Sequence, residues 1–122
     1  MKLAHVGLAV KNLGEAKKLW NSLGFLVEKE FEKSEPRAKV AVLRDGSGGR
    51  LELWEFDQSS DPLIKVIGKH AAFLCEDARA DAANLIANGF KEVVPFTEGV
   101  TLDYIFLQDE LGAFYELAQP KK

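Results

Sequence analysis

Two stretches of the chain have the hydrophobic spacing of amphipathic helices. In the first, Asn12 stands as an N-cap with an acidic residue three positions later, and Gly24 stands where a left-handed C-terminal cap is expected. Apolar residues recur between them at helical spacing and predict one buried face: Leu13, Ala16, Leu19, Trp20 and Leu23. The second helix follows the same plan between Asp77 and Gly89. Its predicted buried stripe comprises Ala78, Ala82, Leu85 and Ile86.

Short runs rich in β-branched and aromatic residues surround both helices and predict strands. One run precedes the first helix at residues 3–10, and three follow it at 25–31, 38–43 and 50–56. The second helix has the same neighbours, with 69–75 before it and 90–96, 100–107 and 113–118 after it. Glycine- and aspartate-containing segments at 44–49 and 108–112 predict hairpin turns. The order strand, helix and three strands therefore occurs twice.

Residue identities indicate that this order reflects a duplication. An offset of 65 places His5 on His70, and an offset of 64 places Glu52 on Glu116, so the second copy lacks one residue. The first module covers about 1–56 and the second about 69–118, with 57–68 as their connector. We expect the chain, residues 1–122, to form a single domain.

Four side chains at equivalent places in the two modules suggest a metal site: His5, Glu52, His70 and Glu116. Alternate residues of a strand share a face, so Leu51 and Leu53 pack toward the helix and leave Glu52 on the opposite face with Arg50 and Trp54. A half-buried carboxylate is costly unless a positive charge compensates it. The four donors therefore predict a site for one divalent cation, and nickel, cobalt, iron, manganese and zinc all suit such a mixed set of nitrogen and oxygen donors. The alternative interpretation is a structural pocket without a metal.

Composition narrows the classes of function. The chain has 122 residues, of which 47% are hydrophobic and 29% charged, an ordinary balance for a globular domain. A net charge of −3 argues against binding to nucleic acid or to an anionic membrane. The single cysteine, Cys75, cannot form an internal disulfide and favours a reducing, cytoplasmic setting. We therefore expect a cytoplasmic protein that binds neither nucleic acid nor a membrane, and the predicted metal site is what indicates a small-molecule substrate as its partner.

Several segments resemble the vicinal oxygen chelate superfamily. Residues 5–13, with Trp20 and 23–25, resemble its opening, and the segments 43–53 and 106–117 resemble its two closing hairpins. The superfamily contains glyoxalase I, methylmalonyl-CoA epimerase, extradiol dioxygenases and bleomycin resistance proteins. The resemblance implies an α+β fold in which two βαβββ modules form an eight-stranded, incompletely closed mixed sheet around a metal pocket. It also implies a homodimer.

The four matched residues are most similar to the metal ligands of glyoxalase I, which are a histidine from the first strand and a glutamate from the last strand of each module. The implied activity is that of a metal-dependent lyase or isomerase of glyoxalase I type. Such an enzyme transfers a proton next to a carbonyl through a metal-stabilised enediolate, with Glu116 or Glu52 as the base. The predicted substrate-binding residues are Arg50, Trp54 and Phe114.

Two other functions of the same fold stay open at this point. A drug-sequestering binding protein would need no metal, and an Fe(II) extradiol-type dioxygenase would use two histidines and one glutamate, which His5, His70 and Glu116 supply. The epimerase usually has glutamine at the position of Glu52, which favours the glyoxalase type. Glutathione-binding glyoxalases usually carry an arginine near the position of Ala9, so glutathione is in doubt as the thiol.

Overall fold

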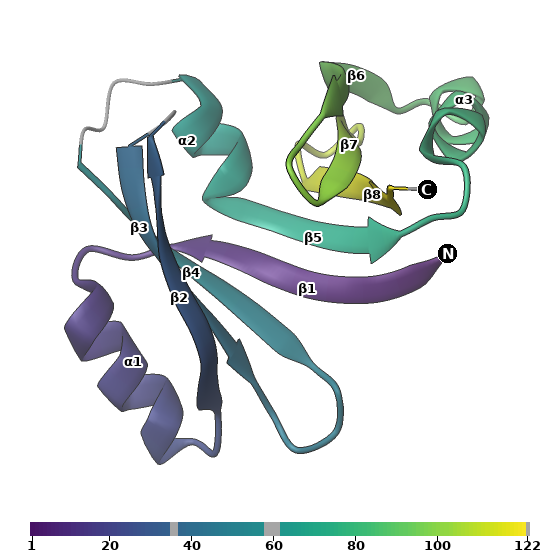
Figure 1. The fold of residues 1–122 in the computed structure, drawn as a ribbon. Coiled ribbons are helices and arrows are strands. Elements are labelled where there is room, and N and C mark those ends of the chain that lie inside the picture. Colours follow the sequence, from purple (N-terminus) through teal and green to yellow (C-terminus); the bar gives the residue numbers. More distant parts are fainter. Residues whose placement is uncertain (35–36, 58–61, 122) are drawn as a thin grey trace. The chain divides into compact units, whose positions relative to one another are not determined.

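The structure is a computed structural model that describes residues 1–34, 37–57 and 62–121. The helices and strands labelled in Figure 1 follow one another along the described chain in this order: β1 (Lys2–Ala9), α1 (Leu13–Ser22), β2 (Leu26–Ser34), β3 (Arg37–Arg44), β4 (Arg50–Phe56), α2 (Pro62–Ile67), β5 (Lys69–Leu74), α3 (Ala78–Ala87), β6 (Lys91–Glu98), β7 (Leu102–Gln108) and β8 (Phe114–Pro120). The predicted α+β class and the repeated order of strand, helix and three strands are confirmed.

Hydrogen bonding orders the eight strands as β2-β3-β4-β1-β5-β8-β7-β6. Each half has the same pairing: β1 runs parallel to β4 and β5 parallel to β8, whereas the two hairpins of each half are antiparallel. The sheet is therefore mixed. It is not closed, because β2 and β6 stand at the two ends of this order.

The chain divides into two compact units. The first unit comprises His5–Lys69, and the second comprises Met1–Ala4 with His70–Lys122. In the first unit, Leu13 packs with apolar residues of β3 and β4 on the face covered by α1, and a separate cluster around Val40 and Trp54 lies on the other face. In the second unit, α3 buries Ala78 and Ala82 against Leu107 and neighbouring residues of β7 and β8.

Local hydrogen bonds explain where α1 begins and ends. The side chain of Asn12 accepts from the backbone N–H of Glu15 at 2.9 Å, as an N-cap does. The first helical N–H, on Leu13, donates to Glu55 Oε1 of β4 at 2.7 Å. After the helix, Gly24 has a φ of 101°, a conformation that favours glycine.

The second helix, α3, repeats these devices at equivalent residues. Asp77 caps it by accepting from the N–H of Ala80 at 3.0 Å, and the N–H of Ala78 donates to Gln119 Oε1 of β8 at 2.8 Å. Gly89 follows the helix with a φ of 103°. The duplication seen in the sequence therefore extends to individual hydrogen bonds.

Three predicted members of the buried helical faces are exposed, and that part of the prediction is wrong. Leu19 and Leu23 have 57% and 61% of their surface exposed, and Ile86 has 44%. Consecutive residues of a helix are about 100° apart, so Leu19 and Ile86 point away from the side on which Trp20 and Leu85 pack. Leu23 stands after the last helical residue.

The predicted connector contains helix α2, which the sequence analysis did not predict. The helix has six residues, too few for a hydrophobic period to be recognised. Its last residue, Ile67, packs against the cluster around Val40 and Trp54. Residues 58–61 of the connector lie outside the described residues.

Candidate functional site

In the first unit, a histidine and a glutamate meet side chain to side chain. His5 is on β1 and Glu52 on β4, and the parallel register places Glu52 opposite Gly7, two residues beyond His5. His5 Nε2 lies 3.3 Å from Glu52 Oε1, and both side chains are largely buried. Leu53 is fully buried against α1, so Glu52 extends from the other face, as the alternation predicted.

The second unit builds an equivalent pair. Glu116 of β8 is opposite Ala72 of β5, again two residues beyond the histidine, His70. His70 Nε2 lies 3.1 Å from Glu116 Oε1, and only 1% of the His70 side chain is exposed. The Phe106 ring meets the imidazole edge to face, with ring centroids 5.3 Å apart. The structure therefore brings together the two residues that the sequence predicted within each module.

These pairs have the chemistry of metal-ligand donors. An imidazole nitrogen and a carboxylate oxygen within about 3 Å already form a charge-assisted contact, and both atom types are common ligands of first-row divalent metals. Each unit offers one nitrogen and one oxygen donor, held by strands and poorly exposed to water. The donor set therefore fits a divalent cation.

A tryptophan holds Glu52 in position, a contact that the sequence analysis did not predict. Trp54 Nε1 donates to Glu52 Oε1 at 3.2 Å. Trp54 itself is 7% exposed and stacks on Phe56, with ring centroids 5.6 Å apart. The alternation of β4 could have suggested this contact, because residues two apart on a strand share a face.

The other two predicted substrate-binding residues lie at the starts of the last strands. Arg50 is the first residue of β4, and its Nε lies 3.2 Å from Glu28 Oε1 of β2. Phe114 is the first residue of β8, is half-buried and pairs with His70 in the parallel register. The Arg50 guanidinium holds the pKa of the exposed Glu28 carboxyl below its usual value.

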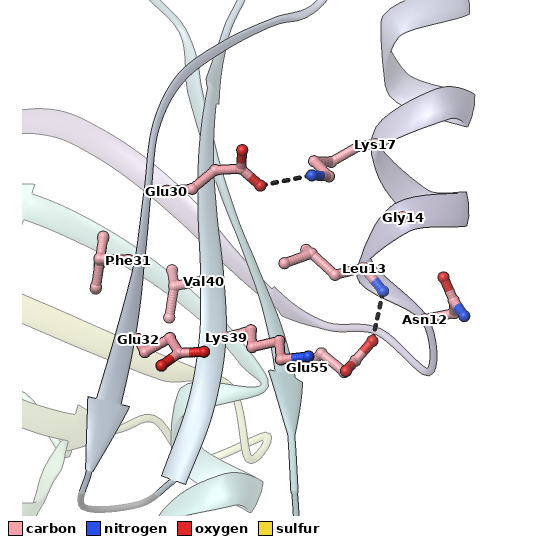
Figure 2. Close-up of a pocket in the computed structure, with 10 residues that line it drawn as sticks. All are labelled: Asn12, Leu13, Gly14, Lys17, Glu30, Phe31, Glu32, Lys39, Val40 and Glu55. Carbon is pink, nitrogen blue, oxygen red and sulfur yellow. Dashed lines mark hydrogen bonds and ion pairs between the residues drawn. The ribbon is translucent and has the colours of Figure 1, made fainter.

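A pocket of about 660 Å³ opens on the face of the first unit that α1 covers (Figure 2). Lys17 of α1 pairs there with Glu30 of β2, and Glu55 accepts from the Leu13 N–H. Its lining residues are Asn12, Leu13, Gly14, Lys17, Glu30, Phe31, Glu32, Lys39, Val40 and Glu55. Glu55 and Glu52 extend from opposite faces of β4, so this pocket is separate from the His5–Glu52 pair.

Outside these pairs, the ionisable groups with shifted pKa values serve the fold. Burial raises the pKa of the Cys75 thiol to about 11, so the residue stays a protonated thiol in the core. In the first closing hairpin, the N–H groups of Ser47 and Gly49 donate to Asp45 and lower the pKa of its carboxyl.

No helix among the described residues is both long and apolar enough to span a membrane.

Comparisons with known proteins agree with this architecture. The structure is similar to a hypothetical protein from Bacillus halodurans C-125, with a TM-score of 0.80 and 22% identity over 99% of this chain and 95% of that one. It is similar to methylmalonyl-CoA epimerase from Mycobacterium tuberculosis, with a TM-score of 0.79 and 23% identity over 99% and 89%. A Streptomyces coelicolor methylmalonyl-CoA epimerase variant in complex with 2-nitronate-propionyl-CoA gives 0.77 and 22% over 100% and 99%.

Sequence comparison is more decisive for the family. A search of curated proteins finds no match to the chain. The family model described as the Glyoxalase/Bleomycin resistance protein/Dioxygenase superfamily, in contrast, matches residues 4–121, which is nearly the whole chain. The chain therefore belongs to the glyoxalase/bleomycin resistance protein/dioxygenase superfamily.

Proposed function

We propose that this protein is a metal-dependent enzyme that moves a proton at a carbon next to a carbonyl, with a lyase or isomerase reaction of glyoxalase I type. The observation that carries the proposal is the pair of acid–base contacts at equivalent positions, His5 with Glu52 and His70 with Glu116. A fold alone does not define an activity, but four donors of this type are more than a plain binding pocket requires.

In this proposal His5, Glu52, His70 and Glu116 together hold one divalent cation. The resemblance to glyoxalase I favours nickel, zinc or cobalt, and the mixed donor set is also compatible with iron or manganese. When bound, the cation supplies a Lewis acid that stabilises negative charge on the substrate oxygens as the proton leaves.

The chain's own residues divide the remaining work. The carboxylate of Glu52 or Glu116 accepts the substrate proton at an oxygen atom and returns it to the neighbouring carbon. Trp54 is a positioning residue, since its indole N–H holds Glu52 Oε1 in one orientation. The Phe106 ring packs against His70 and helps to exclude water from that imidazole. Substitution of the glutamate that serves as the base should therefore lower the activity more than substitution of Trp54 does.

Metal reconstitution tests this proposal. Protein stripped with a chelator is reloaded with nickel, zinc or cobalt, and bound metal is counted by elemental analysis. We expect one metal per site, strong loss of binding in His70→Ala, and metal-dependent turnover of methylglyoxal with a thiol from a panel. A chain that stays metal-free after reloading would contradict the proposal and favour a non-enzymatic small-molecule binding protein.

A second candidate is epimerisation of a CoA-linked acid. Solved methylmalonyl-CoA epimerases share this fold, and epimerisation also removes and returns a proton next to a carbonyl. Exchange of deuterium from solvent into methylmalonyl-CoA, without turnover of methylglyoxal, would select this candidate. Oxygen uptake with Fe(II) and a catechol would instead select the dioxygenase activity. The expected homodimer is tested separately, by gel filtration of the purified protein.

A further inference from the structure

Two arginines stand directly opposite each other at the end of the β3–β4 hairpin. The antiparallel register pairs Arg44 with Arg50, and both are exposed. Directly opposed residues share a face and have Cβ atoms about 5 Å apart, a distance at which like charges repel. One carboxylate, that of Glu28, lies against the pair and contacts Arg50 Nε. A single carboxylate leaves one positive charge of the pair uncompensated.

The arginine pair, one residue on β3 and one on β4, is on the same face of these strands as the candidate metal ligand Glu52. Arg50 and Glu52 are two residues apart, which in a strand corresponds to about 7 Å along the chain. Glu28 accepts from the Nε of Arg50, and a guanidinium carries further N–H donors on its two Nη atoms. Arg44 helps to lower the pKa of Glu28 through its charge, but among the described residues it makes no side-chain hydrogen bond or ion pair.

The second module shows that the fold does not require this pair. The equivalent positions, 64 residues later, hold Gln108 and Phe114, which are paired in the same antiparallel register. The neighbouring glutamate, Glu116, is retained. The first module therefore carries two positive charges near its glutamate, at positions where the second module carries none.

We propose that Arg44 and Arg50 bind an anionic group, a carboxylate or a phosphate, of the substrate whose reacting end lies at Glu52. This inference rests on the proposed function for the location of the reacting end, and it adds the substrate class. The guanidinium groups bind oxyanions through several N–H donors at once. Glu28 competes with the substrate anion for Arg50.

The first test measures anion binding to metal-free protein, so that it does not depend on metal binding. Pyrophosphate and glutarate are titrated calorimetrically as the phosphate and carboxylate probes. We expect Arg44→Gln and Arg50→Gln each to weaken the better probe about tenfold. Glu28→Gln should bind the probe more tightly than the wild type. The matched control is Arg37→Gln, which removes an arginine of the same strand that lies 3.6 Å from Asp57.

The ion pair with Glu28 also makes a purely structural role testable. Arg50→Gln and Glu28→Gln break the same contact and should lower the unfolding midpoint alike, but they should shift anion affinity in opposite directions. Equal affinities in these two variants, or equal weakening in Arg37→Gln, would overturn the proposal. A protein that binds the anion but takes up no metal on reloading would instead refute the proposed function and leave the anion site at Arg44 and Arg50 in place.

Turnover supplies the link between the anion site and the reaction. The metal-loaded enzyme is assayed with methylglyoxal and either glutathione, which carries carboxylates, or 2-mercaptoethanol, which is uncharged. We expect Arg50→Gln to raise KM about tenfold for the anionic hemithioacetal and to raise it much less for the neutral one. Equal effects on both substrates would overturn the assignment of Arg50 to a substrate anion.

Discussion

Replacement of Glu52 by glutamine should weaken metal binding strongly without disturbing the fold. Glutamine has the same shape as glutamate and keeps a carbonyl oxygen, so it still accepts the Trp54 Nε1–H bond that Glu52 accepts at 3.2 Å. Only the negative charge and the strong oxygen donor are lost. The metal-free variant should therefore unfold within about 1 kcal/mol of the metal-free wild type.

The weaker metal binding of the Glu52→Gln variant can be measured as a smaller stabilisation of the folded protein by metal. At a free metal concentration of 100 Kd, binding stabilises the folded wild type by about 2.7 kcal/mol. Removal of a partner behind a metal ligand costs about 10- to 100-fold in affinity, so removal of a ligand should cost at least about 100-fold. The same metal concentration would then stabilise the variant by only about 0.4 kcal/mol. For a chain of this length, the difference corresponds to about 10 °C in Tm.

Thermal unfolding with and without metal measures this difference, and Glu55→Gln is the matched control. Glu55 is on the same strand but extends from the face covered by α1, so its replacement removes the same charge and should keep the full metal-dependent shift. A Glu52→Gln variant with the wild-type shift would refute the reasoning. It would show that the carboxylate is not needed, as expected for an epimerase-type glutamine ligand or a three-ligand dioxygenase site.

Four further outcomes test the fold that positions these pairs. Leu107 is fully buried, so Leu107→Ala should lower the free energy of unfolding by about 3 kcal/mol in a urea titration. Gly24→Ala should cost about 1 kcal/mol in the same assay, because nothing lies within 4 Å of an added Cβ and only the positive φ opposes it. Asp109 accepts from Tyr115, which lowers the pKa of the Asp109 carboxyl in the folded state below its ordinary value of 3.8. Its contribution to stability is therefore present above that pH and is lost as the pH falls through the lowered folded-state pKa, so Asp109→Asn should reduce the dependence of the unfolding midpoint on pH in this acidic range. The Cys75 thiol, with a pKa of about 11, should react with a disulfide reagent at pH 8 only as fast as the protein opens, and rapid reaction of native protein would contradict its burial.

The repeat and the helix boundaries could be predicted from the sequence because their signals are local. An N-cap residue, an acidic residue one turn later and a glycine after the helix are recognisable within a dozen positions. Alternation along β4 also predicted the face from which Glu52 extends, since a strand has a period of two residues. The exposed Leu19 shows the limit of this approach, because hydrophobic spacing indicates a helix more reliably than it indicates which apolar residues are covered.

The contacts of the candidate site depend on strand pairing, which is not local. His5 meets Glu52 because β1 runs parallel to β4 with Glu52 opposite Gly7, and no short stretch of sequence encodes that register. The pairing of Arg44 with Arg50 and the approach of Glu28 to Arg50 likewise require β2, β3 and β4 to be aligned. The sequence identified the residue types, and the fold supplies their distances.

The duplication provides an internal control on which residues serve the architecture. Where the copies use the same device, such as the helix caps Asn12 and Asp77, a structural role explains the agreement. Glu52 and Glu116 do not fit that explanation, since a carboxylate on the inner strands of a sheet costs free energy that an apolar residue would not. Two copies that both retain this cost, each beside a histidine at the same register, point to a shared chemical task for the pairs. A structural role would instead tolerate an uncharged residue in one copy. The helix starts show such a case, because the first N–H of α1 donates to Glu55 and the first N–H of α3 donates to the uncharged Gln119.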